Sequence, residues 1–135
     1  MEETNNLVLY KGGCHCREVR FEVYAEKKLR VFKCNCSVCL MKQNHHFIAK
    51  DRQKSFKIVS GENFLSTYTF NTKKAQHKFC KECGVQPFYF PRSNPDGVAI
   101  TIYCLDDYGS VDYKIIHFDG QNWEQEIISN NEIKD

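Results

Sequence analysis

Closely spaced cysteines constrain this chain more than any other feature of its sequence. Eight cysteines occur in 135 residues, and seven of them fall into three tight clusters. The clusters are Gly13-Cys14-His15-Cys16, Cys34-Asn35-Cys36-Ser37-Val38-Cys39 and Cys80-Lys81-Glu82-Cys83-Gly84. Cysteines separated by one or two other residues can close on one metal ion without long-range folding. The sequence therefore predicts a small fold organised around metal-binding thiolates.

Disulfide bonds are the alternative explanation for so many cysteines. The first six residues, Met-Glu-Glu-Thr-Asn-Asn, have neither the positive region nor the apolar run of a secretory signal. We therefore expect an intracellular protein, cytoplasmic or nuclear, whose reduced thiols bind metal. No apolar stretch approaches the ~20 residues of a membrane span, so no membrane partner is expected. A formal charge of +2 gives no support for a nucleic-acid partner.

Counting ligands divides the cysteines into two zinc sites. A structural zinc takes four protein ligands, whereas a catalytic zinc keeps one position open for water or substrate. If no cluster is split, the two outer clusters supply a closed site with four thiolates: Cys14, Cys16, Cys80 and Cys83. The middle cluster then holds a second zinc ion through three thiolates, those of Cys34, Cys36 and Cys39. A fourth ligand could still close this second site, and the candidates are Cys104, His45 and His46.

Alternating apolar residues between turns predict a mainly β fold. Val19, Phe21 and Val23 alternate with polar residues as in a half-buried strand. A second extended run starting at Leu29 delivers the middle cluster, and Cys39 falls in a short helical turn over residues 37–44. Further strands are expected at 47–49, 56–59, 64–70, 88–90, 98–104 and 113–118, with a terminal strand or helix over 123–128. We expect small antiparallel sheets with short helical segments, and residues 1–135 as a single zinc-binding domain.

The cysteine clusters and their neighbours resemble the glutathione-dependent formaldehyde-activating enzyme family. The resemblance covers a core of about residues 10–123, with seven cysteines in register. Several further segments resemble the centromere protein V type within that family: His46-Phe47-Ile48, Tyr68-Thr69-Phe70-Asn71-Thr72, Lys74-Ala75-Gln76-His77, Gly84-Val85-Gln86, Pro91-Arg92-Ser93-Asn94-Pro95 and Cys104-Leu105-Asp106. The resemblance implies an Mss4-like fold stapled by two zinc sites. It also matches Cys34, Cys36 and Cys39 to the catalytic site and the other four clustered cysteines to the structural site.

Two classes of function follow from this resemblance. The first is a zinc-dependent carbon-sulfur lyase that acts on a glutathione or other thiol adduct of an aldehyde, S-hydroxymethyl-glutathione being the type. The second is a non-catalytic two-zinc module, related to centromere protein V, that binds a protein through exposed Phe88, Tyr89 and Phe90. In the lyase, an open metal position could activate a thiol or polarise a carbonyl. His46 is then either a proton shuttle or a packed histidine.

Two other sequence features bear on the substrate. Basic residues gather in two runs, which are either solvated faces or a positive rim for an anionic small molecule: Lys50, Arg52, Lys54 and Lys57, then Lys73, Lys74, Lys78 and Lys81. Bacterial members of the family tend to carry a glycine where this chain has Tyr103-Cys104-Leu105-Asp106. We therefore expect a different pocket wall in this chain.

Overall fold

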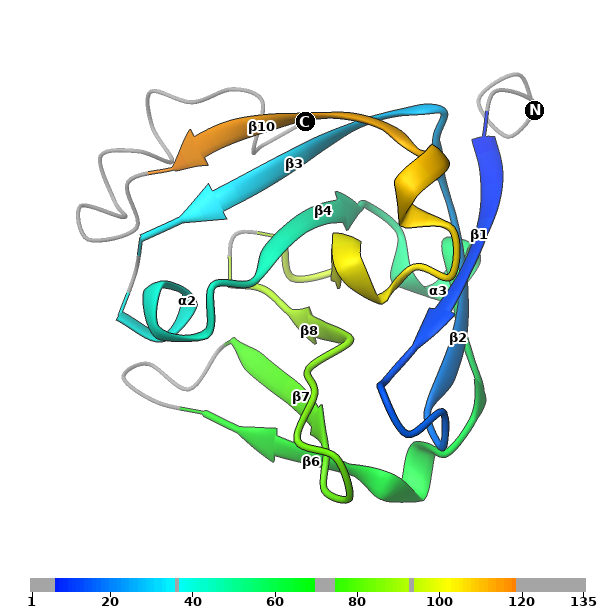
Figure 1. Cartoon of the computed structure of the whole chain (residues 1–135), viewed down its shortest axis with the longest axis vertical. Coiled ribbons are helices and arrows are strands. Elements are labelled where there is room, and N and C mark those ends of the chain that lie inside the picture. The colour runs from blue at the N-terminus through cyan, green and yellow to red at the C-terminus, as the bar shows by residue number, and fades with distance from the viewer. Residues whose placement is uncertain (1–6, 36, 70–74, 93, 119–135) are drawn as a thin grey trace.

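The computed structural model describes residues 7–35, 37–69, 75–92 and 94–118. Most of these residues belong to two β-sheets, which short helical segments connect (Figure 1). The three-stranded sheet has the order β1-β2-β5, with β1 (Leu7–Gly13), β2 (Arg20–Glu26) and β5 (Phe56–Ser60). The seven-stranded sheet has the order β10-β3-β4-β9-β8-β7-β6. Its strands are β3 (Lys28–Cys34), β4 (His45–Ala49), β6 (Leu65–Tyr68), β7 (Gln76–Cys80), β8 (Phe88–Phe90), β9 (Val98–Thr101) and β10 (Asp112–Phe118). The mainly β, Mss4-like prediction is confirmed.

The helical segments are short and lie in the connections. They are α2 (Ser37–Lys42), α3 (Arg52–Ser55) and the 3-10 turns η1 (Glu62–Phe64), η2 (Ile102–Cys104) and η3 (Tyr108–Ser110). The predicted helical turn after the middle cluster is confirmed as α2, which contains the buried Cys39. The turn α3 was not predicted. Asp51 caps it by accepting a hydrogen bond from the Lys54 backbone N–H at 3.3 Å.

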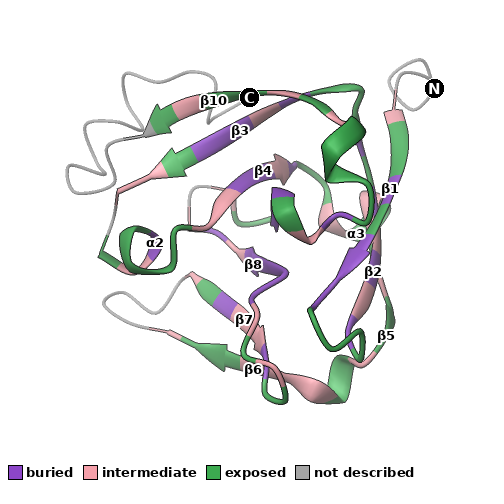
Figure 2. Ribbon diagram, viewed as in Figure 1, coloured by how far each residue is buried: buried purple, intermediate pink, exposed green. Residues whose placement is uncertain are grey.

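The seven-stranded sheet has one apolar face, which we call the core face. Strand pairing places on it Val31, Phe47, Ile100, Phe88 and Cys80, all of them buried. Phe21 of the three-stranded sheet packs against Phe88, with ring centroids 5.8 Å apart. Cys14 and Cys80 belong to the same apolar cluster. Figure 2 shows the buried stretches of β3, β4 and β8 that form this part of the interior.

The opposite face of this sheet, which we call the polar face, carries different side chains. Directly paired residues of antiparallel strands lie on one face, and the pairs Phe32 with His46, His46 with Thr101, and Tyr89 with His77 define it. Cys34 follows Phe32 by two residues and therefore shares this face. His46, Thr101 and His77 are nevertheless buried. The cysteines Cys80 and Cys34 thus lie on opposite faces of one sheet.

Three expectations are modified by the structure. Strand β10 runs parallel to β3, a pairing that strand periodicity does not reveal. Strand β9 ends at Thr101, and all four of its residues are buried because it lies between β4 and β8 with both faces covered. Finally, Phe88 and Tyr89 are not exposed as the binding-module alternative required, since they are 0% and 8% accessible within the same sheet.

Some of the predicted features cannot be compared with the structure, because their residues lie outside the described ranges. The predicted segment 123–128, Phe70 and Cys36 lie outside the described ranges. Within those ranges, no helix has the length and apolar character that crossing a bilayer requires.

Candidate metal centre

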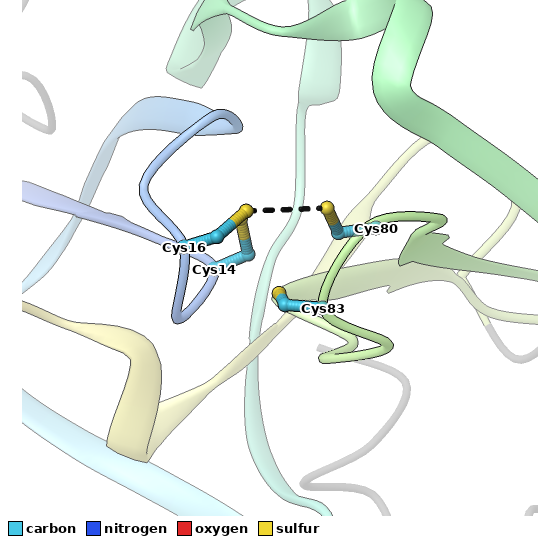
Figure 3. A group of neighbouring side chains, drawn as sticks. All are labelled: Cys14, Cys16, Cys80 and Cys83. Carbon is cyan, nitrogen blue, oxygen red and sulfur yellow. Dashed lines mark hydrogen bonds between the residues drawn. The ribbon is translucent and has the colours of Figure 1, made fainter.

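Four cysteine sulfurs meet where the turn after β1 approaches the end of β7 (Figure 3). All four Sγ atoms lie within 4.8 Å of one another, and the contributing residues are Cys14, Cys16, Cys80 and Cys83. Two sulfur pairs are close to the separation of about 3.8 Å that tetrahedral Zn–S bonds of 2.3 Å impose. Cys14 and Cys16 are 3.5 Å apart, and Cys16 and Cys80 are 3.6 Å apart. The set could therefore hold one tetrahedral metal ion.

Two similar turns bring these thiols together. In the second turn, the Gly84 backbone N–H donates to the carbonyl of Cys80 at 2.7 Å, and Gly84 has the positive φ of 77° expected there. In the first turn, Arg17 donates to the carbonyl of Cys14 at 3.2 Å and also has a positive φ, 69°. A left-handed arginine costs roughly 1–2 kcal/mol, so this turn is strained. In the sequence, this strained turn is marked only by the position of Arg17, directly after Cys14-His15-Cys16.

Backbone N–H groups are also directed at the sulfurs. Val19 donates to Cys14 Sγ and Glu82 donates to Cys80 Sγ, each at 3.4 Å. Such bonds favour a thiolate over a thiol, because the acceptor carries negative charge. They satisfy donors that tight turns would otherwise leave unpaired. These hydrogen bonds therefore stabilise the thiolate forms of Cys14 and Cys80.

The four thiols also perturb one another. Burial acts to raise the pKa of Cys83, but backbone N–H groups and the thiols of Cys14 and Cys16 lower it to about 6. For Cys16, the Glu18 backbone acts to lower the pKa, while burial and hydrogen bonds with the other three thiols raise it to about 12. Cys83 therefore gives up its proton more readily than Cys16. Metal binding would release the thiol protons that remain.

The middle cluster is described in part. Cys34 ends β3 and is half-buried against Phe32, whereas Cys39 is buried in α2. Cys36 lies outside the described residues, so the predicted three-thiolate site remains a prediction. Among the described residues, the only set of three or more closely grouped metal ligands is the four-cysteine site.

The three candidate fourth ligands have different surroundings. Cys104 lies towards the four-cysteine site: burial, then the charges of Cys14 and Cys83, raise its pKa to about 12. His45 Nδ1 is 3.0 Å from the Tyr103 hydroxyl, and burial lowers the pKa of His45. His46 Nε2 is 3.2 Å from the hydroxyl of Tyr89. Among the described residues, none of the three joins Cys34 or Cys39 in a metal-like group.

A pocket of about 680 Å³ opens beside the four-cysteine site. Its volume is in the range of small-molecule sites. The first cysteine turn, the second cysteine turn, the end of α2 and the segment after β9 all contribute to its wall. Its polar and titratable lining residues are Cys14, His15, Arg17, Arg20, Lys42, Gln43, Asn44, Gln86, Thr101, Tyr103, Cys104 and Asp106. The expected Tyr103-Cys104-Leu105-Asp106 segment is thus part of a pocket wall.

Cations in this pocket differ in how far they are neutralised. Arg20 makes a two-pronged contact with Asp106 and lowers the pKa of that carboxyl. Lys42 donates to the Gln86 side chain at 2.6 Å, and burial lowers the Lys42 pKa against the opposing effect of Cys39. Neither Lys42 nor Arg17 makes an ion pair with another described residue. Both can therefore attract an anion into the pocket.

The basic runs noted in the sequence lie elsewhere. Arg52 and Lys78 both cover the Phe90 ring, 4.0 Å and 5.3 Å from its centroid. Lys81 lies 6.0 Å from the centroid of Phe64. Of the members that the structure describes, none lines the pocket. Arg17 and Lys42 could not be recognised as pocket residues from the sequence, because each is a single basic residue beside a cysteine cluster.

Fold and thiol site together define a mainly β protein with a group of four cysteines that could hold a metal ion. The family model described as "Glutathione-dependent formaldehyde-activating enzyme" matches residues 9–122, and the chain belongs to this family. A crystal structure of a Rhodobacter sphaeroides protein is similar, with 30% sequence identity and a TM-score of 0.63. The match covers 77% of this chain and 99% of that chain. The family resemblance in the sequence is therefore confirmed.

Proposed function

We propose that this protein makes or cleaves the carbon-sulfur bond in the adduct of glutathione, or a related thiol, with formaldehyde or another aldehyde. The observation that carries the proposal is the family match, which spans 9–122 and includes all seven clustered cysteines. A reducing intracellular compartment, cytoplasmic or nuclear, is part of the proposal because the chemistry needs thiols. We extend the proposal to residues 1–135 acting as a single domain.

Two zinc ions are part of this proposal. The separations among the sulfurs of Cys14, Cys16, Cys80 and Cys83 suit a closed structural site. We assign the second ion to the middle cluster, Cys34, Cys36 and Cys39, with one position open. A zinc ion held there would supply a Lewis acid beside the reacting thiol and carbonyl. The thiolate ligands themselves would fix its place at the end of β3 and the start of α2.

The pocket residues would hold the rest of the thiol. Glutathione carries two carboxylates, and the pocket cations Lys42 and Arg17 make no direct ion pair with Asp106, which pairs with Arg20. Lys42 follows Cys39 by three residues in α2, so the two side chains share one face of the helix. A carboxylate bound at Lys42 would therefore keep the thiol near the middle cluster. The side-chain amide of Gln86, which already accepts from Lys42, offers a donor as well.

The reaction itself is the reversible addition of a thiol to a carbonyl group. In synthesis, the thiol sulfur attacks the carbonyl carbon, the carbonyl π pair moves to oxygen, and one proton passes from sulfur to that oxygen. In cleavage, the C–S electron pair returns to sulfur, the C=O bond forms again, and the hydroxyl proton passes to sulfur. No oxidant or reductant is needed.

Exchange NMR with ¹³C-formaldehyde and glutathione tests this function. The wild type should speed interconversion of free aldehyde and hemithioacetal above the rate in buffer with the same zinc and glutathione concentrations. Cys36→Ser should lose that acceleration while remaining folded. A wild type that leaves the exchange rate at the buffer value would refute the proposal.

The lysine assignment has its own matched test. Lys42→Met should weaken glutathione binding by roughly tenfold, since hydrogen bonds to charged groups contribute about 1.5–3 kcal/mol. Lys54→Met removes an exposed lysine from α3, outside the pocket, and should leave affinity unchanged. Equal affinities for the two variants would remove Lys42 from the binding site.

The second candidate remains a non-catalytic two-zinc module related to centromere protein V. Two of the three aromatic residues expected on its binding surface, Phe88 and Tyr89, are buried in β8 and Phe90 is half-buried, which favours the lyase. Two bound zinc ions with no exchange activity and no glutathione binding would favour the module.

A further inference from the structure

Three buried titratable side chains adjoin on the polar face of the seven-stranded sheet. They come from β4, β8 and β7, and are His46, Tyr89 and His77, with exposed fractions of 4%, 8% and 3%. The Tyr89 hydroxyl is 3.2 Å from His46 Nε2, and the two rings meet edge to face with centroids 5.1 Å apart. On its other side, Tyr89 stacks on His77 at 4.7 Å with an interplanar angle of 15°. The tyrosine is thus held between two histidines.

The packing of the sheet does not by itself require titratable side chains at these three positions. The core face of the same strands is filled by Phe47, Ile100 and Phe88, which show that apolar side chains suit this sheet. Burying a polar group costs free energy unless it is hydrogen-bonded, and an apolar residue of equal size avoids that cost. Buried titratable groups placed next to one another are more typical of functional sites.

The position of the trio connects the pocket with the middle cysteine cluster. His46 pairs directly with Phe32 across β3 and β4, and Cys34 follows Phe32 on the same face. On its other side His46 pairs with Thr101, which is one of the residues that line the pocket. His46 therefore lies in the row of side chains between the pocket wall and the strand that ends in Cys34.

We propose that His46 and Tyr89 together carry the proton that moves between sulfur and oxygen in the reaction, with His77 as a positioning residue that holds the Tyr89 ring. This inference rests on the proposed function. During C–S bond formation the pair takes the S–H proton and delivers a proton to the new alkoxide oxygen. During cleavage it accepts the hydroxyl proton and returns one to sulfur. The pair is unchanged over a full turnover.

Chemical roles within the pair follow from its contacts. The hydrogen bond fixes the orientation of the imidazole, and stacking on His77 fixes the tyrosine ring. Other groups that face His46 are the Phe32 ring and the Thr101 hydroxyl, which donates to the Gln86 carbonyl at 2.8 Å. Tyr89 and His77 are thus titratable groups of this face that contact one another beside His46. Strand pairing also places Tyr68 of β6 on this face, and Arg30, Cys34 and Lys114 on it towards β3 and β10.

Tyr89→Phe is the most direct variant, because it removes the hydroxyl and keeps the ring. The matched control is Tyr10→Phe, since Tyr10 is 7% exposed and its hydroxyl donates to the Glu26 carbonyl at 2.8 Å in the other sheet. We expect Tyr89→Phe to lower kcat by about 10²-fold, in the range for proton-transfer groups. KM for glutathione should not change, and the control should keep the wild-type kcat.

His46→Gln supplies a second comparison. It should lower kcat as much as Tyr89→Phe, and the double variant should fall no further, because residues that act as a unit are not additive. Folded single variants with wild-type kcat would overturn the inference while leaving the proposed function standing. A wild type without any exchange activity would refute the proposed function and this inference with it.

A measurement on the wild type guards against variants that fail to fold. The ¹⁵N resonances of the His46 imidazole should shift when glutathione and formaldehyde are added to the zinc-loaded protein. The shift should be absent when the aldehyde and thiol are added to Cys36→Ser. Resonances that do not move in the active wild type would overturn the assignment.

Discussion

Replacing Cys80 by serine tests the four-cysteine centre most severely. Cys80 has no exposed surface, its sulfur lies 3.6 Å from that of Cys16, and it accepts a bond from the Glu82 N–H. Serine shortens the side chain and replaces a thiolate with a hydroxyl that binds zinc poorly. The site would be left with three ligands at the junction of the two sheets. With the proposed zinc ion bound at this site, we expect Cys80→Ser to lose the ion and to unfold globally.

The expected magnitude distinguishes a metal centre from a simple thiol cluster. A structural zinc contributes an apparent ~10–16 kcal/mol, comparable with the ~5–15 kcal/mol stability of a whole domain. Without metal, Cys80→Ser would only bury a hydroxyl, at a cost of about 1–3 kcal/mol. A loss of that size would lower Tm by several degrees and leave a cooperative transition. Thermal melts and zinc content by mass spectrometry measure the two outcomes.

Cys104→Ser is the matched control for this experiment. Cys104 is a half-buried thiol whose pKa is raised in part by the charges of Cys14 and Cys83, but it is not one of the four grouped ligands. The Cys104→Ser variant should therefore keep both the zinc content and the melting transition of the wild type. Cys80→Ser protein that keeps its zinc and a cooperative melt would refute the metal centre.

Three further substitutions make separate predictions. Gly84→Ala should cost only about 1–2 kcal/mol, because φ is positive but no atom lies within 4 Å of the new Cβ. Gly12→Ala should cost about 3 kcal/mol or more, since its Cβ would lie 2.3 Å from a backbone oxygen, and urea melts compare the two. Asp106→Asn should cost about 0.5 kcal/mol at pH 7, a value discounted for its partly exposed pair with Arg20. Because Arg20 lowers the Asp106 pKa, this difference should persist down to about pH 4 and vanish as the folded carboxylate protonates below it. A pH-independent difference would contradict the assignment of the pair.

Local sequence patterns were sufficient for the elements that carry the middle cysteine cluster, whereas β1 and β7, which lead into the other two clusters, were not predicted. Alternation predicted the strand that ends at Cys34, and the absence of Gly and Pro predicted the helical turn around Cys39. Ligand counting predicted the four-cysteine set that the fold brings together. These features depend on short spacings and on the preference of zinc for four ligands, both of which are local properties.

The pairing of strands that are far apart in the sequence could not be predicted from local patterns. The parallel contact of β10 with β3 joins residues far apart in the sequence, and periodicity carries no information on strand order. The pocket cations Arg17 and Lys42 were missed because only the fold brings the first cysteine turn beside the end of α2. His46 was considered as a shuttle or a packed side chain, but its contact with Tyr89 depends on β9 lying between their strands.

Native mass spectrometry with and without glutathione tests the central claim most directly. We predict two zinc ions per chain and one glutathione, and for Cys36→Ser one zinc ion and no glutathione. The wild type with a single zinc ion, or with two zinc ions and no glutathione at high glutathione concentration, would contradict an open second metal site that accepts a thiol.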